Sequence, residues 1–397
     1  MTPPLPIYLD NHATTRTDPR VVAAMLPYFT EDYANPSSTN HRMGEQAAQA
    51  VAAARSQVAS LLGAAEREIL FTAGATESNN LAIKGVAAAY RHKGNHLVSV
   101  VTEHPSVLEP LKALERSGFQ ITLLGVDACG YVKPHQIAAA LTDQTVLVSV
   151  MLANNEIGTI LSLAEIGRIC KGRGVILHSD ATQAVGKIPL DVDVLDVDLL
   201  SLSAHKFNGP KGIGALYVRR REPRVRLEPL LEGGGQEHNL RSGTHNVPGI
   251  VGLGAACALA GEEMATEALR VAALRDRLWA GFQKRIPEIY LNGPPLAERL
   301  PGNLNVSFAY VQGEALLLSL KDVAVSSGSA CTTMSQEPSH VLRAIGRSDD
   351  LADASLRFGL GRFTTQEEID WVIDHVAASV ARLRALSSAA AHLTRQQ

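Results

Sequence analysis

The sequence is poor in cysteine and lacks the paired spacings that metal sites and disulfide frameworks use. Its four cysteines, Cys129, Cys170, Cys257 and Cys331, lie far apart and form no CxxC pair. This pattern argues against a disulfide framework and against a zinc site. The apolar surroundings of Cys129, Cys170 and Cys257 predict unreactive thiols at helical or strand-edge positions, whereas Cys331 lies in a polar stretch.

The sequence also has little excess charge and no long apolar run, and we expect no secretory signal. The formal net charge is only -3, which argues against non-specific attraction to nucleic acid or membranes. We expect the basic run at 219–221 to be a solvated strand end. The N-terminus has neither the basic nor the apolar region of a secretory signal, and the uncharged stretch at 247–261 is too short to cross a bilayer. These features predict a cytoplasmic protein with no direct nucleic-acid or membrane partner.

The chain is long enough for a large core, because it has 397 residues with 46% hydrophobic content. Apolar runs and helical patterns alternate through its first half, which predicts an α/β fold with a mainly parallel central sheet flanked by helices. A long helix at 249–286 should lead to a second, smaller α+β domain, in which residues 323–326 form one strand and a capping box at 364–367 begins the last helix. We expect a large domain at 15–262, with 1–14 and 263–397 in the small one.

A lysine follows the apolar run at 198–203 and leads into a glycine-rich turn. Lys206 in that place can bind pyridoxal phosphate (PLP) covalently, although a lone lysine is more often a surface residue. Asp180 ends the preceding apolar run, where an acid can keep the pyridine nitrogen of PLP protonated or can simply cap a helix. The two residues in this order predict a PLP enzyme.

Other polar residues also follow predicted strands. They are His104, Asn155, Gln183, Ser203 and His205. Ligands of parallel sheets bind beyond the carboxyl ends of the strands, so this recurrence indicates one shared site. The small-residue turn at 73–80 opens a helix whose free N–H groups suit a phosphate, although an ordinary capped helix would look the same.

Residues 326–339 are rich in serine, glycine and threonine, which predicts an exposed loop. The thiol of Cys331 on such a loop would be accessible and could act as a nucleophile. Alternatively, the cysteine is an incidental small residue.

Nine motifs together resemble those of one family. They are Tyr8-Leu-Asp-Asn-His-Ala-Thr-Thr15, Phe71-Thr-Ala-Gly-Ala-Thr-Glu-Ser78, Thr102-Glu-His104, Asn154-Asn-Glu-Ile-Gly158, Asp180-Ala-Thr-Gln183, Ser203-Ala-His-Lys206, Arg241-Ser-Gly-Thr244, Ser326-Ser-Gly-Ser-Ala-Cys331 and Arg357-Phe-Gly-Leu-Gly-Arg362. The chain is similar to group I cysteine desulfurases, which belong to the class V aminotransferases of the fold-type I PLP enzymes. The resemblance covers nearly the whole chain.

The resemblance implies a role for each site residue. Lys206 would hold PLP and later act as a base, and Asp180 would pair with the pyridine nitrogen. His104 would stack on the ring and aid proton transfer, while Gln183 would contact the phenolic oxygen. The phosphate would be bound by Ala75, Thr76, Ser203 and His205, and by Thr244 from a second subunit. The substrate carboxylate would be bound by Asn35, Asn155 and Arg357, and Asn155 would also lie near the cofactor.

The implied reaction takes sulfur from L-cysteine, leaving alanine and a persulfide on Cys331. The sulfur would pass to an acceptor protein for iron-sulfur cluster assembly or tRNA thiolation, and the enzyme would be a homodimer. The C-terminal segment departs from that of relatives that dock the cluster scaffold, so the resemblance does not predict scaffold docking. Two alternatives are a selenocysteine lyase or aminotransferase that does not need Cys331, and a sulfur carrier with a decayed site. Intact Lys206, Asp180 and Arg357 argue against the carrier.

Overall fold

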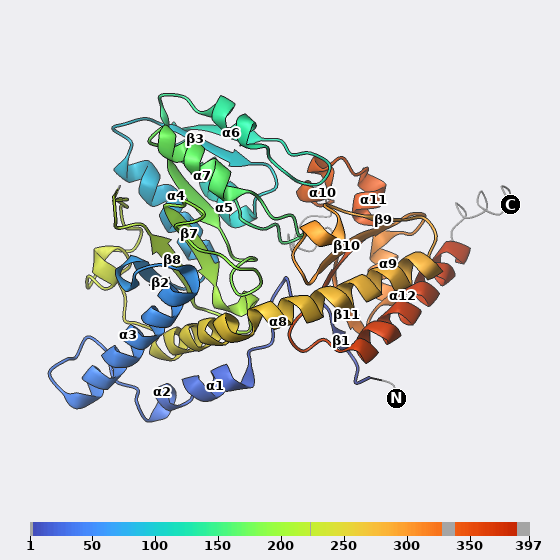
Figure 1. The fold of residues 1–397 in the computed structure, drawn as a ribbon, viewed down its shortest axis with the longest axis horizontal. Helices are drawn as coiled ribbons and strands as arrows, with labels where there is room; N and C mark the ends of the chain where they lie inside the picture. The colour runs from blue at the N-terminus through green and yellow to red at the C-terminus, as the bar shows by residue number, and fades with distance from the viewer. Residues whose placement is uncertain (1–2, 223, 328–337, 387–397) are drawn as a thin grey trace.

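The largest element of the fold is a seven-stranded sheet (Figure 1). The computed structural model describes residues 3–222, 224–327 and 338–386. The strands, in the spatial order β2-β8-β7-β6-β5-β3-β4, are β2 (Ile69–Thr72), β3 (His96–Val100), β4 (Gln120–Leu124), β5 (Thr145–Ser149), β6 (Ile176–Asp180), β7 (Leu199–Ser203) and β8 (Gly214–Val218). Neighbours from β7 to β4 are parallel, whereas β8 is antiparallel to both β2 and β7. The prediction of a mainly parallel sheet is confirmed.

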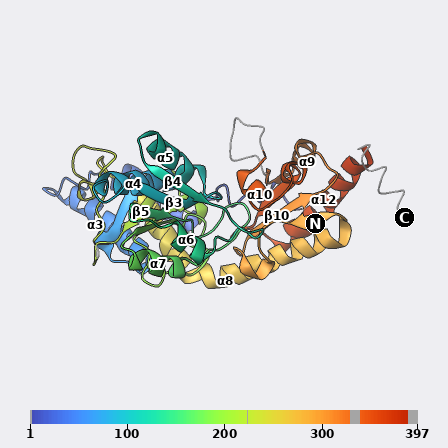
Figure 2. The ribbon, with the colours of Figure 1, turned by 90° about the horizontal axis from the view of Figure 1, so that it is seen from above.

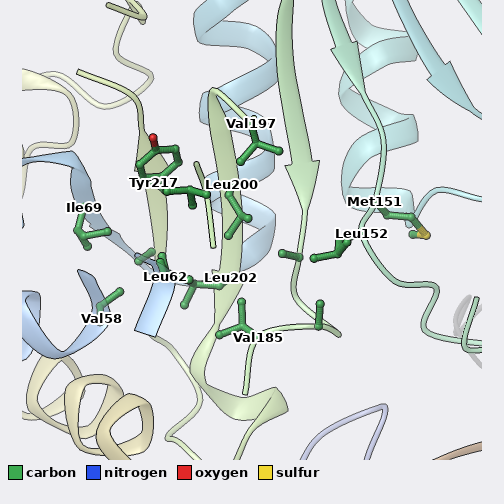
Figure 3. Close-up of a cluster of buried hydrophobic side chains, with 14 of the residues drawn as sticks. Val58, Leu62, Ile69, Met151, Leu152, Val185, Val197, Leu200, Leu202 and Tyr217 are labelled. Atoms are coloured by element: carbon green, nitrogen blue, oxygen red, sulfur yellow. The ribbon is translucent and has the colours of Figure 1, made fainter. Parts of the chain in front are cut away.

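Helices cover both faces of this sheet. Successive residues of a strand point to opposite faces, so a strand that is apolar throughout needs a helix layer on each side. In β7, Leu199 packs into the core beneath α4 (Ala75–Ala89) and α5 (Pro105–Arg116). The next residue, Leu200, packs into the opposite core with α3 (Arg42–Leu62) and α7 (Leu163–Gly172). Figure 3 shows part of this second core, with Leu202 of β7 beside Leu62 of α3. Continuous apolar runs therefore mark strands that are buried on both faces.

A smaller body lies at the other end of the molecule (Figure 2). Its four-stranded antiparallel sheet has the order β12-β13-β10-β9, and β1 pairs with β11 in parallel. The elements are β1 (Ile7–Tyr8), β9 (Ile289–Leu291), β10 (Asn303–Phe308), β11 (Val323–Ala324), β12 (Ser326–Ser327), β13 (Ser355–Gly359), α9 (Gly313–Ser319), α10 (His340–Ala344), α11 (Asp349–Asp353) and α12 (Gln366–Leu386). The expected smaller α+β unit is present, while the proposed boundaries at 15–262 and at 1–14 with 263–397 stay a prediction.

One long helix, α8 (Val247–Arg285), runs along both bodies (Figure 1). Leu253 lies in a core of the large sheet, whereas Phe282 lies in the core of the small one. By length and composition α8 could cross a membrane, but half of its most apolar window is buried inside the protein. This burial is typical of a core helix. The remaining helices are short: α1 (Pro19–Met25), α2 (Pro27–Thr30) and α6 (Pro134–Ala140).

Three local predictions were wrong. The capping box of α12 lies one residue later than expected: the Thr365 N–H donates to Glu368 Oε2 and the Glu368 N–H donates to Thr365 Oγ1. The predicted strand at 323–326 is divided, since β11 pairs with β1 and β12 with β13. Arg219 is buried rather than solvated, because Nη2 donates to the Val197 carbonyl at 2.7 Å and Nε lies near the Asp198 carboxylate.

The small core predicts a measurable effect of shortening Phe282. Its ring is fully buried, and its centroid lies 5.2 Å from that of Phe358. Phe282→Ala should lower the free energy of unfolding by about 3–5 kcal/mol in urea titrations, because the cavity cannot fully collapse. Leu269→Ala is the control on the same helix, because Leu269 is 76% exposed and should cost about 0.5 kcal/mol or less. Equal losses for the two variants would contradict this packing.

Candidate active site

A cavity of about 780 Å³ lies beyond the carboxyl ends of the large sheet's parallel strands. Its walls bring together most of the residues selected from the sequence: Ala75, Thr76, His104, Asn155, Asp180, Gln183, Ser203, His205, Lys206 and Arg357. Asn35 and Thr244 are exposed and do not line this cavity. Cys331 lies outside the described residues. The strand-end argument thus located the cavity, because β3, β5, β6 and β7 all end at this edge.

Lys206 is held by the main chain of the N-terminal strap, which we define as residues 10–15. The 3-10 turn Ala204–Lys206 follows β7 directly. Lys206 Nζ donates to the carbonyls of His12 at 2.8 Å and Ala13 at 2.7 Å, and the Thr15 N–H donates to the His205 carbonyl. The strap therefore fixes the amine at the cavity wall.

Asp180 is a buried carboxylate at the end of β6 with two donors. Its Oδ1 accepts from the Thr182 N–H at 2.9 Å, and its Oδ2 accepts from Asn79 Nδ2 at 2.8 Å. Asn79 is fully buried in α4. Hydrogen bonds to both oxygens fix the orientation of the carboxylate, as a partner for a pyridine nitrogen requires.

Burial disfavours the charged form of His104 and His205, the two cavity histidines that were selected from the sequence. Burial lowers the pKa of His104, which caps α5 through Nδ1. Burial and the nearby charge of Lys206 lower the pKa of His205 to about 4. A neutral imidazole has one donor nitrogen and one acceptor nitrogen. Both residues can therefore hydrogen-bond to a polar ligand without adding charge.

Gln183 lines the cavity and is held by hydrogen bonds at both ends of its amide. Its Nε2 donates to the His12 carbonyl at 2.8 Å, and its Oε1 accepts from Lys187 Nζ at 2.6 Å. Burial lowers the pKa of Lys187 to about 7, helped by the charges of Lys206 and Arg357. An amide nitrogen carries two hydrogens, so Nε2 can also donate to a phenolic oxygen of PLP, the contact that the resemblance implies.

Arg357 brings a guanidinium from the small sheet into the cavity. Nη2 donates to Asp10 Oδ1 at 3.0 Å and to Ser326 Oγ at 2.9 Å, and Nη1 donates to the Asn155 carbonyl at 3.0 Å. Nε is buried and has no hydrogen-bond partner within the described part of the chain. The group already contacts one carboxylate and retains an unused donor.

The residues of this cavity fit PLP. Ala75 and Thr76 begin α4, a 15-residue helix whose N-terminal N–H groups and dipole suit a phosphate. Gly74 has φ +149°, and the Cα of Gly74 would lie 2.7 Å from a Cβ added at Gly214, so this turn needs small residues. Buried polar atoms of His12, Thr182 and Arg357 lack partners among the described residues, as expected where a polar ligand binds.

Several residues that line the cavity or hold its lining residues were not selected from the sequence as site residues. His12 and Asp10 lie in a quoted motif, yet an assignment required knowing that this segment crosses between the two sheets. Asn79, Ser106 and Lys187 follow the selected residues in the next turn of helix or loop. The sequence signal that could have identified these residues is a polar residue about one turn beyond a residue already selected.

The remaining cysteines differ in their surroundings. Cys170 and Cys257 are buried in α7 and α8, and burial raises the pKa of both thiols. Cys129 was predicted at a helix or strand edge, but it lies in a turn and is partly exposed. The Asp127 side chain accepts from its N–H, which explains the turn.

A model of the aminotransferase class-V family matches residues 7–372. The chain belongs to the class V aminotransferase family. The cysteine desulfurase IscS of Anaeromyxobacter sp. (strain K) is 57% identical to this chain over 383 residues, which cover 96% of this chain and 94% of the relative. A solved NifS-like protein has a TM-score of 0.88 at 39% identity, covering 96% of this chain and 100% of its own. The structure of SspA in complex with cysteine has a TM-score of 0.79 at 38% identity, covering 90% and 100%.

These relatives confirm the resemblance to the cysteine desulfurase group within the class V aminotransferases, whose cofactor is PLP.

The low pKa of His205 predicts a loss of stability in acid. The unfolded chain binds a proton at an ordinary pKa of 6.5, whereas the folded chain binds it at about 4. Between these values the unfolded state holds more protons, so stability falls as the pH is lowered. The urea midpoint of cofactor-free His205→Gln should therefore fall less over this range than that of the wild type. The exposed His135→Gln is the control, and a fall equal to the wild type in His205→Gln would refute the linkage.

Proposed function

We propose that this cysteine desulfurase takes sulfur from L-cysteine with PLP bound to Lys206 and transfers it to the thiol of Cys331. The convergence of Lys206, Asp180 and Arg357 on one cavity is the observation that carries the proposal. An amine, a buried acid and a guanidinium are the three groups needed to hold the cofactor, tune its ring and bind an amino-acid carboxylate.

When bound, PLP supplies an electron sink that weakens bonds around the substrate's α-carbon. Lys206 would hold the cofactor and then move protons at its Nζ, and the strap carbonyls that accept from Nζ would keep it in reach. Asp180 would keep the pyridine nitrogen protonated, with its own oxygens fixed by Thr182 and Asn79. Ser203 and His205, beside the start of α4, would bind the phosphate together with Ala75 and Thr76.

Arg357 would bind the carboxylate of L-cysteine, with Asn155 beside it; a role for Asn35, which does not line the cavity, stays a prediction. The present contact with Asp10 supports this role, because the guanidinium already accommodates a carboxylate oxygen at 3.0 Å. Its buried Nε lacks a partner within the described chain and could complete a second hydrogen bond to the substrate. The solved neighbour SspA in complex with cysteine supports cysteine as the ligand.

Thr244 would contact the phosphate of a second subunit, which makes a homodimer part of the proposal. It is exposed, and it follows a loop that is anchored to its own subunit. Glu237 in this loop accepts from Arg55 at 2.6 Å and from the Phe71 N–H at 2.9 Å, and Arg241 donates to Glu77 at 2.8 Å. These anchors support a rigid loop that can present Thr244 to a partner.

The sulfur would leave the enzyme on an acceptor protein for iron-sulfur cluster assembly or tRNA thiolation. The name IscS of the relatives supports the cluster pathway. The C-terminal residues 387–397, on which scaffold docking would depend, lie outside the described residues. We expect the enzyme to act in the cytoplasm.

Removing the thiol of Cys331 tests the sulfur-transfer step. Cys331→Ala should keep the PLP absorbance and lose on the order of 100-fold or more in sulfide and alanine release from L-cysteine, because no nucleophile then accepts the sulfur. Cys129→Ala is the matched control, since Cys129 is the partly exposed cysteine of the described chain. Wild-type turnover by Cys331→Ala would favour the lyase reading.

Shortening the guanidinium tests the carboxylate site. Arg357→Lys should lower kcat/KM for L-cysteine about 10- to 100-fold, mainly through KM, because an ammonium cannot form the paired hydrogen bonds of a guanidinium. Steady-state alanine release measures the effect. Arg277→Lys, which alters an exposed pair with Asp370, should leave both constants unchanged. An unchanged KM in Arg357→Lys would remove Arg357 from the substrate site.

A further inference from the structure

A series of hydrogen bonds connects Asp180 with His104 through Asn79, which also orients the Asp180 carboxylate, and Ser106. Asn79 Nδ2 lies 2.8 Å from Asp180 Oδ2 and 2.8 Å from Ser106 Oγ. Ser106 Oγ in turn lies 2.8 Å from His104 Nδ1, and the Ser106 N–H donates to the same nitrogen at 3.1 Å. Asn79 and Ser106 are buried, and they connect α4 with the start of α5.

The donors and acceptors in this series of hydrogen bonds allow one arrangement of protons. The Asp180 carboxylate only accepts, so Asn79 must present its NH₂ group; the reversed amide would place two acceptors 2.8 Å apart. The same NH₂ group then donates its second hydrogen to Ser106 Oγ, which directs the hydroxyl hydrogen to His104 Nδ1. The backbone N–H of Ser106 can only donate to that nitrogen.

His104 Nδ1 must therefore be an acceptor, and the neutral ring must carry its proton on Nε2. We propose that Asn79 and Ser106 are positioning residues that fix His104 in the Nε2–H tautomer and couple its orientation to that of Asp180. His104 then enters the reaction as a hydrogen-bond donor and acid through Nε2, while Lys206 serves as the base. This assignment rests on the proposed function for its chemical meaning but not for the tautomer.

Charged groups near His104 do not alter the assignment. Asp180 favours the protonated ring, whereas Lys206, His340 and Arg357 disfavour it, and burial is the largest influence and also disfavours it. A protonated ring would place an Nδ1–H against the Ser106 N–H. The hydrogen-bond chain and the burial thus act in the same direction.

Nitrogen NMR on ¹⁵N-histidine-labelled holoenzyme tests the tautomer directly. His104, assigned by loss of its signals in His104→Gln, should show a protonated-type Nε2 and an unprotonated, hydrogen-bonded Nδ1. The measurement needs no turnover, so it remains informative if L-cysteine is not the substrate. A protonated Nδ1 in the neutral ring would overturn the proposal.

Ser106→Ala tests the role of the hydroxyl. Loss of a donor to the neutral ring should raise the pKa of His104 by about half a unit to one unit in the same NMR titration. Ser78→Ala is the matched control, because Ser78 is also a buried hydroxyl near the start of a helix, but bonds to Thr72 Oγ1 and the Ala215 carbonyl instead. Equal His104 titrations in the two variants would show that Ser106 only packs, and would overturn its positioning role.

Discussion

The active site depends on a short backbone segment that must form hydrogen bonds with both the large and the small body. The N-terminal strap (residues 10–15) donates from the Asn11 N–H to the Gly359 carbonyl of the small sheet and from the Thr15 N–H to the His205 carbonyl beyond β7. The approach is so close that a Cβ at Gly359 would lie 2.9 Å from the Asn11 nitrogen. The strap carbonyls that hold Lys206 are therefore placed by contacts with both bodies.

The same arrangement explains why the site unites groups of different origin. The large sheet contributes Asp180 and Lys206 at its strand ends, where parallel strands leave polar residues together. The small sheet contributes Arg357 from the middle of β13, paired with Asn305 and Ser326. The proposed cofactor site on one body thus meets the proposed carboxylate site on the other, and the strap contacts both bodies.

Much of this could be predicted from the sequence. Apolar runs located the central parallel strands because those strands are buried on both faces, and polar residues just beyond them line the cavity. The contacts between segments could not be predicted in the same way. The Asp10–Arg357 pair and the Gln183–His12 hydrogen bond join segments far apart in the sequence and depend on how these segments pack, which no local pattern specifies. The one-residue error in the α12 capping box has a similar cause, since Thr364 and Thr365 are equally suitable caps by residue type.

The continuity of α8 limits how the cavity can change its width. Because this helix has side chains in the cores of both bodies, turning the small sheet away from the large one would bend the helix and break its backbone hydrogen bonds. The strap, which is hydrogen-bonded to both bodies, opposes the same motion. The cavity walls contributed by the large and the small body therefore keep a fixed distance. A substrate has to enter and leave through the mouth of the cavity rather than by separation of these walls.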